Sequence, residues 1–96
     1  MTIKLELFYS PYCSRCRKAR KAVQSFAAAW PADRLHYREL DVLEELERAV
    51  TLGVMQTPAL AIDDVLVAGP LPSTKALEDL LLHRLKTASS SHAADS

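Results

Sequence analysis

The N-terminal third of the chain constrains the fold most, because a strand pattern runs directly into a helical one. Apolar residues recur at every second position from Ile3 to Tyr9, which predicts a strand. Ser10-Pro11 ends that strand, and an amphipathic helix is predicted from Ser14 to Ala29, before Pro31. The apolar positions of this helix are Ala19, Val23, Phe26 and Trp30. A strand that feeds a helix in this way is typical of an α/β domain.

The middle of the chain repeats this alternation. Leu35 to Val42 is predicted to be a second strand, and Asp41 followed three residues later by Glu44 resembles a capping box that opens a second helix. Gly53 is the expected C-cap of that helix. A βαβ unit with parallel strands therefore starts the domain.

The last part of the chain predicts a hairpin and a helix. Two apolar strands, 59–62 and 65–68, flank Asp63-Asp64 as a turn, and Gly69-Pro70 closes the hairpin. Ser73 is expected to cap a final helix. The apolar positions of that helix are Leu77, Leu80, Leu81 and Leu85. Residues 1–86 are thus expected to form one domain, and residues 87–96, small and polar in composition, a disordered tail.

Two cysteines lie where the first strand enters the first helix. Cys13 and Cys16 form a C-x-x-C motif, which beside a βαβ pattern indicates thioredoxin-like redox chemistry. A helix N-terminus favours a thiolate at Cys13, and helical phase places Cys16 on the apolar stripe. We therefore expect Cys13 to be reachable and to attack a disulfide, and Cys16 to be shielded and to resolve the mixed disulfide.

Two further features accompany the cysteines. Arg15, Arg17 and Lys18 make the turn cationic, which favours a lower thiol pKa or an anionic partner, although a plain solvated helix face is the commoner use of such residues. Thr57-Pro58 immediately precedes the apolar strand that begins at Ala59, where a proline cannot donate to the sheet. A cis X-Pro bond at that position would turn the preceding backbone toward solvent.

These residues resemble the thioredoxin and glutaredoxin superfamily from Ile3 to about Lys86. The segment Phe8 to Cys16 is similar to the redox turn, and Gly53 to Pro58 is similar to the segment that ends in a cis-proline. The resemblance implies a thioredoxin-like α/β fold, βαβαββα, with a four-stranded mixed sheet and helices on both faces. It also implies that the Thr57 backbone meets an extended substrate or glutathione, and that Pro58 flanks the sulfurs.

The chain departs from the family pattern at several positions. Leu7 stands where thioredoxins carry a buried acid, Ser14-Arg15 replaces the usual pair between the cysteines, and Gly69 to Pro72 replaces the glutaredoxin glutathione signature. If the fold is as implied, Tyr12 and Met55 border Cys13 and are candidates for substrate contact, as is Arg15. The expected electron source is a reductase or glutathione, and no bound cofactor or metal is expected.

Charge and composition exclude several function classes. Twelve Lys and Arg balance twelve Asp and Glu, so net charge gives no attraction to nucleic acid or to a membrane surface. The alternating start lacks the apolar run of a signal peptide, and no apolar stretch approaches the roughly 18 residues of a spanning helix. A cytoplasmic protein is expected, in which two cysteines are catalytic, redox-sensing or metal-binding rather than structural.

Two alternatives to an enzyme stay open at this point. The cysteines of two chains would suffice to share zinc, copper or an iron–sulfur cluster, and His36 or His83 is a further zinc-ligand candidate. The second alternative is an interaction domain in which both thiols are inert. Metal content and thiol reactivity distinguish these hypotheses from disulfide exchange.

Overall fold

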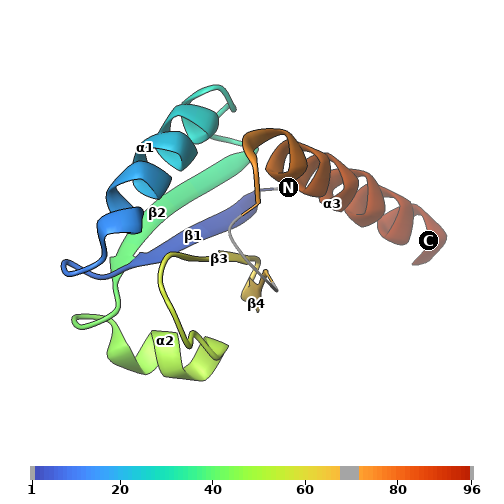
Figure 1. The fold of residues 1–96 in the computed structure, drawn as a ribbon. Helices are drawn as coiled ribbons and strands as arrows, with labels where there is room; N and C mark the ends of the chain where they lie inside the picture. Colours follow the sequence, from blue (N-terminus) through green and yellow to red (C-terminus); the bar gives the residue numbers. More distant parts are fainter. Residues whose placement is uncertain (1, 68–71, 96) are drawn as a thin grey trace.

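The computed structural model describes residues 2–67 and 72–95, with side chains as far as Arg84. Its elements are β1 (Ile3–Tyr9), α1 (Ser14–Ala28), β2 (Leu35–Asp41), α2 (Leu46–Leu52), β3 (Ala59–Ile62), β4 (Val65–Leu66) and α3 (Thr74–Asp95). Figure 1 shows α1 and α2 on opposite sides of the sheet, with α3 on the side of α1. The predicted order of strands and helices is confirmed.

The four strands form one mixed sheet in the order β2-β1-β3-β4. β1 pairs in parallel with β2, with Leu5 opposite Tyr37, and antiparallel with β3, with Leu7 opposite Leu60. β3 pairs antiparallel with β4. The chain thus has the predicted thioredoxin-like architecture, and β1 lies at its centre because it has a neighbour on each side.

The central strand is buried on both faces. Leu5 and Leu7 lie on the face that α1 and α3 cover, whereas Phe8 lies on the face that α2 covers. The first face holds the larger cluster of buried side chains, which are Ile3, Leu5, Leu7, Val23, Phe26, Leu35, Leu60, Ile62, Leu77 and Leu81. Trp30 packs against this cluster and beside Phe26, with the ring centroids 5.9 Å apart. The core is therefore built from the period-two and helical patterns of the sequence.

The start of α2 differs from the sequence prediction. α2 begins at Leu46, with Glu45 as its N-cap residue, so the expected capping box at Asp41 and Glu44 is wrong. The Asp41 carboxylate instead accepts a hydrogen bond from the Leu43 N–H at 2.8 Å, which forms a local turn after β2. Gly53 ends α2 with a φ of 87°, as expected for a left-handed C-cap.

The predicted hairpin turn is confirmed and is held by side chains. Asp63 and Asp64 both have positive φ, 49° and 69°, the backbone that a two-residue hairpin turn requires. The Asp63 carboxylate accepts a hydrogen bond from the Lys4 N–H at 2.8 Å. β4 ends at Leu66, earlier than the predicted strand 65–68, and the predicted closure at Gly69-Pro70 lies outside the described residues.

The last helix is longer than the sequence predicted. The Ser73 hydroxyl accepts a hydrogen bond from the Ala76 N–H at 3.2 Å and caps α3, as expected. The backbone then remains helical to Asp95, which differs from the predicted disordered tail at 87–96. No proline or glycine interrupts residues 74–95, so no helix-breaking residue ends the helix at the end of the apolar stripe. In the described part of the chain, no helix combines the length and apolar character needed to cross a membrane.

Candidate redox site

The end of β1 and the start of α1 position the two cysteines. Cys13 is the N-cap residue of α1, with extended backbone angles, and its own N–H bonds to the Ser10 carbonyl at 3.1 Å. Cys16 lies in the first turn of α1 and is 2% exposed, whereas Cys13 is partly exposed. The predicted difference in access between the two thiols is therefore confirmed, and both cysteines are free thiols.

Hydrogen bonds at the helix start stabilise the ionised form of Cys13. A hydrogen bond from the Cys16 side chain contributes most to lowering the Cys13 pKa, against the opposing effect of burial. The Thr57 side chain and the backbone N–H groups of Cys16 and Arg15 lower this pKa further. The Cys13 thiolate is thus stabilised mainly by neighbouring dipoles.

The same geometry keeps Cys16 protonated. Burial in the apolar face of α1 raises the Cys16 pKa most, and the hydrogen bond to Cys13 raises it further. The two sulfurs therefore differ in the direction of their pKa shifts as well as in access.

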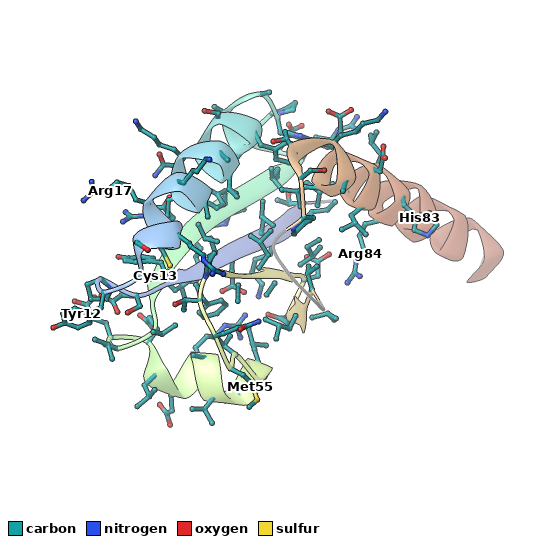
Figure 2. The ribbon with its side chains drawn as sticks, viewed as in Figure 1. Tyr12, Cys13, Arg17, Met55, His83 and Arg84 are labelled. Carbon is teal, nitrogen blue, oxygen red and sulfur yellow. The ribbon has the colours of Figure 1, made fainter. Side chains whose placement is uncertain are left out.

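A shallow hollow opens beside Cys13. It encloses about 340 Å³ and is lined by Pro11, Tyr12, Cys13, Ser14 and Arg17. Tyr12 is 89% exposed, so its ring presents apolar surface to solvent. Figure 2 shows Tyr12, Cys13 and Arg17 at the same end of the molecule. A partner that reaches Cys13 meets an aromatic ring and a guanidinium group there.

Most of the predicted substrate-contact residues lie at this site. The Thr57-Pro58 bond is cis, and the Cys13 thiol donates a hydrogen bond to the Thr57 carbonyl oxygen at 3.6 Å. Arg15 contributes its backbone N–H, and its side chain is exposed. Met55, by contrast, does not lie at the redox site. It is 93% exposed, but it lies near the end of α2, well apart from Cys13 in Figure 2. The expectation that Met55 borders Cys13 is therefore wrong, because the chain turns back toward the cysteines only at Thr57.

Sequence reasoning missed a buried carboxylate on β1. Glu6 is fully buried, and its two oxygens accept hydrogen bonds from Arg38 at 2.8 Å and from Arg48 at 2.7 Å. Burial alone would raise the Glu6 pKa, but the two guanidinium groups hold this pKa below its usual value. Leu7, the next residue, is buried on the opposite face of the sheet because successive side chains of a strand alternate between faces.

Arg48 also pairs with Asp64, and Asp64 pairs with Lys4 at 2.7 Å. We call Glu6, Arg38, Arg48, Asp64 and Lys4 the Glu6 cluster. It joins β1, β2, α2 and the hairpin turn on the α2 side of the sheet. Position-by-position analysis could not find it because Arg48 follows Glu6 by 42 residues.

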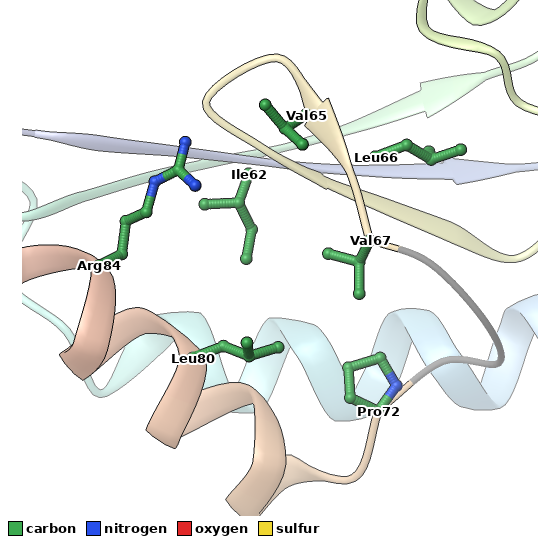
Figure 3. Close-up of a pocket in the computed structure, with 7 residues that line it drawn as sticks. All are labelled: Ile62, Val65, Leu66, Val67, Pro72, Leu80 and Arg84. Atoms are coloured by element: carbon green, nitrogen blue, oxygen red, sulfur yellow. The ribbon is translucent and has the colours of Figure 1, made fainter. Parts of the chain in front are cut away.

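Within the described residues, no group of three or more His, Cys, Asp and Glu side chains is arranged to hold a metal ion. His83 lies on α3, far from Cys13 in Figure 2. A second hollow of about 430 Å³ lies between the hairpin and α3 (Figure 3). Its lining residues are Ile62, Val65, Leu66, Val67, Pro72, Leu80 and Arg84. It contains neither cysteine and is separate from the redox site.

A four-stranded mixed sheet with a dithiol at the N-terminus of α1 and a cis-proline beside it defines the thioredoxin-like class. Comparison with known proteins supports the same assignment to the thioredoxin-like class. A family model described as the thioredoxin domain matches residues 1–82. The chain belongs to the thioredoxin family.

Individual relatives give the extent of this similarity. The thioredoxin of Methanocaldococcus jannaschii is 33% identical over 84 residues, covering 86% of this chain and 96% of that protein. A probable thioredoxin of Methanothermobacter thermautotrophicus is 30% identical over 77 residues, covering 80% of this chain and 89% of that protein. The structure of thioredoxin 1 from Thermosipho africanus superposes with a TM-score of 0.71 at 18% identity, covering 90% of this chain and 98% of that one. Family membership supports a thiol–disulfide oxidoreductase type of function.

Proposed function

We propose that this protein exchanges disulfides with protein or small-molecule partners through Cys13 and Cys16. The observation that carries the proposal is that the two thiols differ in both accessibility and pKa. The accessible thiol, Cys13, has a lowered pKa, and the buried thiol, Cys16, has a raised pKa. A pair of inert thiols needs no such difference. The relatives named above are thioredoxins, which supports the same chemistry.

The proposed reaction has two steps. The Cys13 thiolate attacks one sulfur of a partner disulfide, an S–S bond forms between them, and the partner's other sulfur leaves as a thiolate and takes up a proton. Cys16 then loses its proton and attacks the Cys13 sulfur, which releases the partner's second thiol. The partner gains two electrons, and the protein becomes a Cys13–Cys16 disulfide.

The surroundings of Cys13 support roles in partner binding. The Thr57 carbonyl lies within hydrogen-bond distance of the Cys13 sulfur, so Thr57 and Pro58 would flank an extended partner chain. Tyr12 and Arg15 are exposed beside the attacking sulfur and would contact the partner. A reductase or glutathione, acting in the cytoplasm, would return the two electrons without a bound cofactor.

The first test is the redox equilibrium of the metal-free protein in glutathione buffers, with Cys13 and Cys16 followed by alkylation and mass. A single intramolecular disulfide that forms and reverses with a two-electron potential is expected. A potential near about −270 mV would mark a reductant and one near about −120 mV an oxidant.

Three results would contradict the proposal. If only glutathione adducts and dimers form, the two-step mechanism is wrong. Near-stoichiometric metal in freshly purified, unchelated protein would favour the metal-binding alternative. Cys13 alkylation at the rate of an ordinary thiol of pKa about 8.5 would favour an interaction domain.

A further inference from the structure

The cations of this chain are concentrated on the helix that carries the redox site. Five of the twelve Lys and Arg residues lie between positions 15 and 21, and no Asp or Glu occurs from Ser10 to Ala32. These five residues are Arg15, Arg17, Lys18, Arg20 and Lys21. A chain with balanced total charge therefore has a strongly positive segment beside Cys13.

Helical phase places three of these cations on one outward stripe. At about 100° per residue, Arg17, Lys18 and Lys21 point away from the buried positions of α1, which are Cys16, Ala19, Val23 and Phe26. All three side chains are exposed. The stripe begins at Arg17, which lines the hollow beside Cys13 together with Ser14. It therefore leads directly away from the attacking sulfur.

The stripe has no internal counter-charge. Arg20, which faces the edge of the sheet, pairs with Glu39 at 3.0 Å and lies over the Tyr9 ring at 4.2 Å. By contrast, no ion pair among the described residues includes Arg17, Lys18 or Lys21. The segment just before α2, which carries two glutamates, lies across the sheet from α1 (Figure 1). The charge of the stripe is available to a partner.

Building on the proposed function, we infer that the preferred substrate is a disulfide in a polypeptide with an acidic segment next to one of its cysteines. From Arg17 to Lys21 the three cations span about 6 Å along α1, the length of about two extended residues. Two or three carboxylates in sequence match these cations along that length, with Arg17 nearest the sulfur. The exposed Tyr12 ring lines the hollow and can contact an apolar side chain of the substrate next to its disulfide.

Three peptides with one internal disulfide test this inference. They are identical except for a flanking run of three Asp, three Asn or three Lys. Reduced protein is mixed with each peptide under single-turnover conditions, and the second-order rate of disulfide transfer is followed by acid quench and mass. The Asp peptide is expected to react at least about tenfold faster than the Lys peptide, and the difference to shrink at about 1 M salt.

Variants assign the preference to the stripe. R17Q/K18Q/K21Q should bring the Asp-to-Lys rate ratio close to one, whereas R17K/K18R/K21R, which keeps the charges, should preserve it. Lys75→Gln removes one cation from the exposed start of α3 and should also preserve the ratio. Because each variant is judged by a ratio, a general change in thiol reactivity cancels.

The outcomes separate this inference from the proposed function. Equal rates for the three peptides, or a preference that survives in R17Q/K18Q/K21Q, would overturn the inference and leave disulfide exchange intact. A charge-dependent rate with oxidised glutathione but not with the Asp peptide would overturn it in favour of a small anionic substrate. No transfer to any disulfide would overturn the proposed function, and the inference with it.

Discussion

The redox turn and the Glu6 cluster both stabilise the ionised form of a side chain next to the sheet, but in opposite ways. Glu6 is fully buried and has two guanidinium partners, so its charge is neutralised where it lies. Cys13 is partly exposed, and the groups that lower its pKa are a thiol, a hydroxyl and backbone N–H groups. A charge met by counter-charges joins strands and helices, whereas a charge met only by dipoles remains reactive.

Removing the attacking sulfur should have the largest effect. Cys13→Ser is expected to lower the rate of disulfide reduction by at least about 10³-fold, because a hydroxyl at this position does not ionise near neutral pH. Cys16→Ser should instead accumulate a mixed disulfide on Cys13, visible as an added mass that dithiothreitol removes. Substantial activity in the Cys13 variant would show that the reactive group lies elsewhere.

Removing the buried carboxylate should have the next largest effect. Glu6→Leu leaves Arg38 without this partner and Arg48 with Asp64 alone, and because both guanidinium groups reach solvent it is expected to lower the free energy of unfolding by about 1–3 kcal/mol, measured by urea denaturation. Asp64→Asn, at an exposed member of the same cluster, is the matched control and should cost far less.

Replacing the whole buried group sharpens that test. E6L/R38M/R48M removes all three charges together and should recover much of the lost stability. The Cys13 alkylation rate should be unchanged in Glu6→Leu, because no contact joins Glu6 to either sulfur. A changed alkylation rate would mean that the two regions are coupled rather than independent.

Much of the fold and the cysteine pair follow from local patterns. Period-two and helical spacing predicted β1 and α1, and the helical phase of Cys16 relative to Val23 predicted which thiol is buried. The Glu6 cluster depends on residues far apart in the chain, and the alternation that placed Leu5 and Leu7 in the core made Glu6 resemble a solvent-facing residue. Because the central strand is buried on both faces, alternation along it no longer separates buried residues from solvent-facing ones.

Local patterns also misplaced two details of the site and its surroundings. Asp41 forms a turn with Leu43 rather than a capping box, because an Asx turn and an N-cap use the same side-chain oxygen. Met55 was expected beside Cys13 from the implied fold, but the segment that follows α2 approaches the cysteines only at Thr57, just before β3. Loop paths of this kind are set by tertiary packing.

Acid should weaken the Glu6 cluster before it affects the redox turn. Bound guanidinium and ammonium groups lower the pKa of Glu6 and bring that of Asp64 to about 2. A lowered folded pKa contributes stability above the unfolded value of about 4 that is lost as pH falls toward the folded one. Urea midpoints should therefore fall between about pH 5 and 2, and less steeply in Glu6→Leu. If the urea midpoint falls equally steeply with pH in the unmodified protein and in Glu6→Leu, the acid sensitivity does not arise from Glu6.

The smallest expected effect is on the titration of Cys13 itself. Because the hydrogen bond from Cys16 contributes most to lowering the Cys13 pKa, Cys16→Ala should move that pKa upward. The measurement is the pH dependence of iodoacetamide alkylation, with Thr57→Val as a comparison that removes a lesser contribution. A Cys13 pKa that stays constant in Cys16→Ala would assign the lowering to the helix start alone.

The positive stripe on α1 and the carboxylates that precede α2 lie on opposite sides of the sheet (Figure 1). A molecule with zero net charge therefore has a dipole moment across its sheet. In the field of a charged surface it feels a torque but almost no net pull. Near an acidic surface it would therefore turn the outer face of α1 toward that surface before any contact forms.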